Sequence, residues 1–166
     1  MPEHTILARH KDVKSMERLS IPLIKRCIEV TLDLEGVDKP CEVSVLITND
    51  SAMRQINLKF RGIDKTTDVL SFPMVEFSPP GWGDPGPDAA DPDTGIIPLG
   101  DIVLSAKRVE LQALDHGRNS DTEAAHLTIH SVLHLLGYDH MDGEDDDRVM
   151  RQKENLIMKM LKKGEV

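Results

Sequence analysis

The segment from His130 to His140 constrains this chain more than any other part of its sequence. His130 and His134 are one helical turn apart, so in a helix both imidazoles project from the same face. Gly137 follows the apolar run, and a glycine can take the left-handed conformation that ends a helix. The chain can then turn and bring His140 back towards the other two histidines. Three imidazoles with one further position open form the layout of a catalytic zinc site.

His126 continues the same row of histidines but fits a single ion less well. His126 and His134 would lie roughly 12 Å apart along a helix axis, whereas zinc ligands lie about 2 Å from the metal. The ligands we expect are therefore His130, His134 and His140, with His126 beside the site. Two simpler alternatives are histidines without a metal and a purely structural zinc. A structural site usually takes four protein ligands, often cysteines, and both cysteines of this chain are far away in sequence.

The histidine segment also nearly matches the long zinc-protease signature HExxHxxGxxH. The glutamate of that signature activates the zinc-bound water, and here its position is taken by Ser131. A serine hydroxyl cannot accept that proton at neutral pH. A zinc peptidase or esterase is therefore disfavoured, whereas a metal site that polarises water or a phosphoryl oxygen is retained.

Chain length and hydropathy favour one domain over residues 1–166 in a cytoplasmic protein without a membrane partner. No apolar run approaches the ~20 residues needed to cross a bilayer, and the N-terminal segment has no hydrophobic stretch of signal-peptide type. Prolines and glycines gather at about 78–98, where we expect a loop with little to bury.

The net charge of −9 does not indicate a broad nucleic-acid surface. A local patch could still engage a few phosphates. Lys59, Arg61 and Lys65 lie close together in sequence, and we expect Lys107 and Arg108 to extend this patch across a cleft.

Hydrophobic periodicity predicts an α+β fold, in which a small mixed sheet of about four strands is covered by helices and the metal-bearing helix packs centrally. The expected strands are 5–8, 42–48, 68–73 and 99–104. The expected helices are 20–34, 52–60, 105–114, 121–136 and a last one after the acidic run 144–147. Side chains suited to cap these helices at their N-termini are Ser20, any one of Asn49, Asp50 and Ser51, Ser105 and Asp121.

Three separated blocks of this sequence resemble the YbeY family of bacterial and organellar endoribonucleases. They are HSVLHLLGYDH at 130–140, FRG at 60–62 followed by TDVLSF at 67–72, and LGDI at 99–102. The resemblance covers most of the chain from about Glu42 onward and implies an α+β fold with a metal-centred cleft. One departure is Ser131, where we expect glycine in the family.

The resemblance implies a zinc-dependent endoribonuclease, a hydrolase that cuts phosphodiester bonds of single-stranded RNA. It implies roles in 16S rRNA 3′-end maturation and ribosome quality control, with rRNA, the ribosome and its ribosomal or assembly proteins as partners. His130, His134 and His140 would hold one metal ion, usually zinc, although another divalent metal is possible. Arg61 would bind RNA and act in catalysis, together with His130. The alternative is a non-catalytic ribosome-assembly factor whose metal is structural.

Overall fold

The computed structural model describes residues 2–139 and 144–164. In chain order the elements are β1 (Thr5–His10), η1 (Ser15–Glu17), α1 (Ile21–Leu34), β2 (Cys41–Thr48), α2 (Asp50–Arg61), β3 (Val69–Pro73), β4 (Ile97–Ser105), α3 (Ala106–Asp115), α4 (Ser120–Leu135) and α5 (Glu144–Gly164). The predicted strands and helices are all present, with ends that differ by a few residues.

The four strands form one mixed sheet in the order β1-β2-β4-β3. β1, β2 and β4 run parallel, and β3 pairs antiparallel with β4 at the sheet edge. The sheet confirms the predicted α+β fold. No helix in the described ranges is long and apolar enough to cross a membrane.

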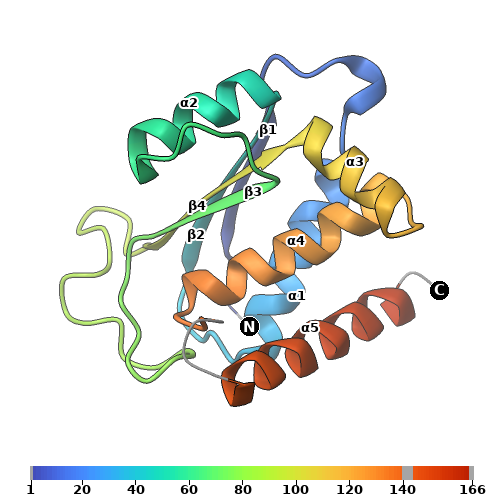
Figure 1. Ribbon diagram of the computed structural model, residues 1–166. Coiled ribbons are helices and arrows are strands. Elements are labelled where there is room, and N and C mark those ends of the chain that lie inside the picture. The colour runs from blue at the N-terminus through green and yellow to red at the C-terminus, as the bar shows by residue number, and fades with distance from the viewer. Residues whose placement is uncertain (1, 140–143, 165–166) are drawn as a thin grey trace.

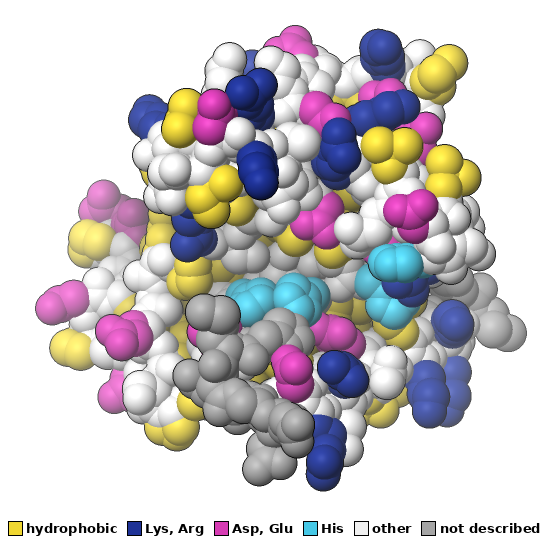
Figure 2. Space-filling model, viewed as in Figure 1, with side chains coloured by type: hydrophobic (Ala, Val, Ile, Leu, Met, Phe, Trp, Pro, Cys, Tyr) yellow, Lys and Arg dark blue, Asp and Glu magenta, His cyan; other side chains and the backbone are white. Residues whose placement is uncertain are grey.

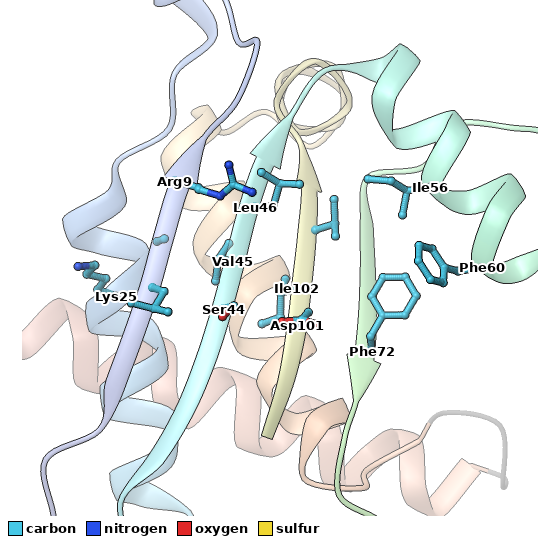
Figure 3. A pocket seen from close by; sticks show the side chains of 13 residues that line it. Arg9, Lys25, Ser44, Val45, Leu46, Ile56, Phe60, Phe72, Asp101 and Ile102 are labelled. Carbon is cyan, nitrogen blue, oxygen red and sulfur yellow. The ribbon is translucent and has the colours of Figure 1, made fainter. Parts of the chain in front are cut away.

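The alternating pattern of β2 decides which side of the sheet is covered. Val43, Val45 and Ile47 are buried, whereas the intervening Ser44 and Leu46 are half-exposed. Helices α1 and α4 lie against the buried face, and α5 packs on the outside of both (Figure 1). The other face is left largely open, apart from α2 beside its β3 edge (Figure 3).

Helix α4 is the central helix, as predicted, with most of its circumference buried between the sheet, α1 and α5. The expected cap at Asp121 is wrong, because Asn119 Oδ1 accepts the backbone N–H of Thr122, 2.8 Å away. Asp121 instead accepts the N–H of Ser20 at the start of α1. The predicted glycine break is confirmed: α4 ends at Leu135 and Gly137 follows with φ 95°.

The segment between β3 and β4 contradicts the expectation that it has little to bury. Phe77 is a core side chain, and the Trp82 ring lies 5.7 Å from it between centroids. The Trp82 indole N–H donates to Asp38, and the Gly81 N–H donates to the Leu136 carbonyl, 2.8 Å away. The segment therefore packs against the end of α4, beside the predicted metal ligands.

Gly100 allows β3, β4 and α4 to approach one another closely. Its φ is 146°, and a Cβ there would clash with the Phe72 carbonyl and lie 2.9 Å from a methyl of Leu135. Only glycine fits without a shift of the backbone.

Candidate functional site

A cavity of about 500 Å³ lies where the end of α4, strand β3 and the end of α2 meet. Figure 2 shows histidine side chains in a hollow across this face of the molecule. The cavity wall is made by Arg61, Val69, Leu70, Ser71, Pro73, His130, His134, Gly137, Tyr138 and Asp139. Three of the predicted site residues, Arg61, His130 and His134, thus share one cavity although they come from distant parts of the sequence.

The two histidines of α4 point their Nε2 atoms at each other. These atoms are 2.9 Å apart, and the rings are nearly perpendicular with centroids 4.5 Å apart. Two nitrogens bound to one tetrahedral zinc at ~2.0–2.1 Å would be about 3.3 Å apart. A few tenths of an ångström of opening would therefore let both nitrogens ligate the same ion.

Glu154 on α5 fixes the orientation of His130. The His130 Nδ1 atom lies 2.6 Å from Glu154 Oε1, and both side chains are mostly buried. A proton on Nδ1 that is donated to this carboxylate leaves the lone pair on Nε2, on the side of His134. The pair is therefore arranged as ligating histidines commonly are. Sequence reasoning missed Glu154, because no spacing connects it with a histidine 24 residues earlier.

The third predicted ligand, His140, lies outside the described residues. Among the side chains that the structure describes, those of residues 2–139 and 147–163, no group of three or more His, Cys, Asp or Glu could hold a metal ion. Asp139 and Tyr138 both line the cavity, so the chain beyond Gly137 returns to the cavity wall just before position 140. The metal ligation by His130, His134 and His140 remains a prediction.

Tyr138 ties α5 to this site. Lys153 Nζ lies 5.1 Å from the centre of the Tyr138 ring and 2.8 Å from a carboxylate oxygen of Glu35. Burial raises the pKa of Tyr138, and its hydrogen bond with Glu35 raises it further. Burial lowers the pKa of Lys153, but the carboxylate of Glu35 outweighs this, so the net shift is upward. Glu154, the next residue along α5, is thereby fixed against α4.

Arg61 is the last residue of α2, which Gly62 ends in the left-handed conformation with φ 72°. One terminal N–H of the guanidinium donates to the Ser71 carbonyl, 2.6 Å away, and the guanidinium carbon lies 5.1 Å from the centre of the Phe72 ring. The nearby carboxylate of Asp64 pairs with Arg54 at 2.7 Å. Arg61 is instead attached to strand β3 and lines the histidine cavity.

Lys107 and Arg108 do not extend the basic patch across the cleft. Lys107 forms ion pairs with Glu17 and Glu110, and Arg108 forms one with Asp50. Neither side chain lines the histidine cavity.

His126 lies beside the cavity wall rather than in it, as expected from its spacing. Burial lowers the pKa of His126, and the nearby charge of Arg118 lowers it further.

Ser131 is fully buried, and its hydroxyl has no hydrogen-bond partner in the described part of the chain. Ser131 faces the packed interior and does not line the histidine cavity.

The sequence profile of the family described as "Endoribonuclease YbeY" matches residues 5–162. The chain belongs to this family. The endoribonuclease YbeY of Caldanaerobacter subterraneus is 42% identical over 139 residues, which cover 84% of this chain and 85% of that relative. The endoribonuclease YbeY of Clostridium botulinum strain Hall is 41% identical over 159 residues, which cover 91% of this chain and 93% of that relative.

The same fold occurs in the solution structure of TM1509 from Thermotoga maritima. It is 22% identical, has a TM-score of 0.60, and the match covers 95% of this chain and 89% of that one. YbeY family membership confirms the resemblance found in the three sequence blocks and gives this chain the role of an RNA-cleaving hydrolase.

Proposed function

We propose that this chain is a metal-dependent endoribonuclease that cuts single-stranded RNA. The observation that carries the proposal is the shared cavity, in which the convergent nitrogens of His130 and His134 and the guanidinium of Arg61 all take part. Zinc is the ion we propose, because two imidazole nitrogens backed by a carboxylate suit it. Another divalent metal with the same preference remains an alternative.

The metal, when bound, would lower the pKa of a water molecule and withdraw charge from a phosphoryl oxygen. The side chains of this protein would position the ion and the RNA. His130, His134 and His140 would hold the ion, and Glu154 would keep His130 in the ligating tautomer. Arg61 has five N–H donors and commits one to the Ser71 carbonyl, so others can hold two oxygens of a phosphodiester. Its fixed charge would also stabilise the negative charge that develops on the phosphate.

We also propose that the substrate includes the 3′ end of 16S rRNA and that the protein acts in ribosome quality control. The overall charge of −9 favours weak RNA affinity outside the basic end of α2. Ribosomal or assembly proteins would then bring the enzyme to its RNA. Both cysteines are buried thiols, which suits the reducing cytoplasm.

The test is cleavage of single-stranded ribosomal RNA by the purified protein, with and without a chelator, beside Arg61→Ala. The matched control is Arg54→Ala, which removes an arginine of the same helix that pairs with Asp64 and does not line the cavity. We expect chelation and Arg61→Ala each to abolish cleavage, with Arg54→Ala active and all proteins folded by circular dichroism. Cleavage that survives both treatments would refute the proposal.

The variant His134→Ala distinguishes a metal-dependent enzyme from a non-catalytic assembly factor whose metal is structural. An enzyme is expected to lose cleavage while the variant stays folded, with a thermal unfolding midpoint near that of the unsubstituted protein measured without chelator. A structural metal predicts that the substitution unfolds the chain. In bacteria whose own YbeY has been deleted, the chain should restore mature 16S rRNA 3′ ends, and Arg61→Ala should not.

A further inference from the structure

A second, larger groove lies on the open face of the sheet, on the other side of β3 from the histidine cavity. It measures about 760 Å³. Figure 3 shows Leu46 and Asp101 on its floor, with Ile56 and Phe60 of α2 pointing into it from one side. Nothing in the metal chemistry uses this groove.

The strand register arranges the floor of the groove in two rows across the sheet. One row is Leu7, Ser44, Asp101 and Phe72. The next is Arg9, Leu46 and Val103, and at its β3 end Val103 pairs with Leu70, which lines the histidine cavity instead. The seven groove-lining side chains of these rows point to the open face, because residues two apart on a strand share a face. With strands about 4.8 Å apart, each row spans roughly 14 Å. A four-stranded sheet face of this size accommodates about two or three stacked bases.

Two aromatic rings stand at the end of the groove nearest the histidine cavity. Phe60 is 59% exposed, and its ring meets that of Phe72 edge-on, 5.4 Å between centroids. Lys59 Nζ lies 5.3 Å from the Phe60 ring centre, and the Arg61 guanidinium lies over Phe72. Large exposed aromatics flanked by cations are what single-stranded nucleic acid stacks on.

The groove and the histidine cavity lie next to each other, with neighbouring residues of the edge strand β3 in their walls. Ser71 and Pro73 line the histidine cavity, and the intervening Phe72 lines the groove. Arg61 bridges the two, since it lines the cavity and also lies over the Phe72 ring. A strand whose phosphate is held by Arg61 therefore meets Phe72 and Phe60 next.

The charged side chains along the groove suit phosphates at its two ends and a base in its middle. Arg9 and Lys25 line the far end, at β1 and α1, and Lys59 stands at the near rim. Asp101 lies in the middle, where it would repel a phosphate. A carboxylate there can accept a hydrogen bond from the amino group of a base.

We propose that this groove is a binding site for the stretch of single-stranded RNA that adjoins the cut bond, with a base stacked on Phe60 and Phe72 and phosphates near Lys59, Arg9 and Lys25. This proposal rests on the proposed RNase function, which places the bond to be cut in the histidine cavity. RNA fits better than a protein segment, because the groove has cations at both ends and adjoins, across β3, the cavity that Arg61 lines.

The experiment measures binding of a cleavage-resistant 2′-O-methyl RNA 12-mer that carries one 2-aminopurine, a base whose fluorescence falls on stacking. The variants are Phe60→Ala, Phe60→Trp and Lys25→Ala. The matched control is Leu58→Ala, because Leu58 is a 48% exposed apolar residue of the same helix that does not line the groove.

We expect Phe60→Ala to raise the dissociation constant by about 5- to 150-fold, the range for loss of one base–aromatic stack, and to remove the quenching. Phe60→Trp should retain both, and Leu58→Ala should bind as the unsubstituted protein does. Lys25→Ala should lower the slope of log affinity against log salt by about 1.

Unchanged binding and quenching in Phe60→Ala would overturn the proposal, even if the protein cleaves RNA in an Arg61-dependent way. A protein segment would then be the better hypothesis for what binds in the groove. Conversely, Phe60-dependent stacking in a protein that cleaves no RNA would support the groove and refute the nuclease.

Discussion

Removal of the Glu154 carboxylate should weaken metal binding without disrupting the fold. The carboxylate lies 2.6 Å from His130 Nδ1, with side-chain exposures of 19% for Glu154 and 26% for His130. Loss of such an outer partner of a ligating histidine costs ~10- to 100-fold in metal affinity, or about 1.4–2.7 kcal/mol. Because solvent partly screens this pair, we expect Glu154→Ala to lie near the lower end of that range.

Glu154→Gln should cause a smaller loss of metal affinity. Its amide oxygen can still accept the Nδ1 proton but has no charge, so the loss should be smaller than that of Glu154→Ala. The assay is competition for zinc with a chromophoric chelator, and the control is Glu29→Ala, which removes an exposed carboxylate from α1. Equal zinc affinity in folded Glu154→Ala and in the control would refute the role of Glu154 in orienting the ligand.

Three further expectations concern the fold around the site, each measured by urea unfolding. Ser131→Ala should raise the free energy of unfolding by up to about 1 kcal/mol, because it removes a buried hydroxyl without a described partner; a clear decrease would contradict this. Gly100→Ala should lower it by about 1–3 kcal/mol, since a Cβ there clashes with Phe72 and Leu135; an unchanged midpoint would show that β3 gives way. Burial raises the pKa of Glu123, but hydrogen bonds from neighbouring polar groups, including Arg118, outweigh this and lower it from the ordinary 4.5. The unfolded state therefore binds the proton more readily, and stability should fall as pH drops below about 4.5; Glu123→Gln should flatten that fall.

Local patterns were sufficient to predict the elements and half of the site. The one-turn spacing of His130 and His134 and the break at Gly137 were read directly from the sequence, because helical geometry fixes them. The alternation of β2 likewise indicated which of its side chains are buried. These features depend on neighbours in sequence, so a local reading finds them.

The features that were missed depend on contacts between distant segments. Glu154 meets His130 only because α5 packs beside α4, and Trp82 meets Asp38 across more than forty residues. Asp121 has the right chemistry for a helix cap, but Asn119 starts the helix two residues earlier. Lys107 and Arg108 were assigned to the cleft on charge alone, whereas carboxylates from distant segments, Glu17 and Asp50, pair with them.

The dependence of His130 on α5 has a consequence for the order of synthesis. A ribosome delivers β1 first and α5 last of the described elements, so α4 can fold while α5 is still inside the exit tunnel. Until Glu154 emerges, His130 lacks the carboxylate that selects its tautomer. A growing chain would therefore hold the proposed metal ion less tightly until α5 has emerged and packed beside α4.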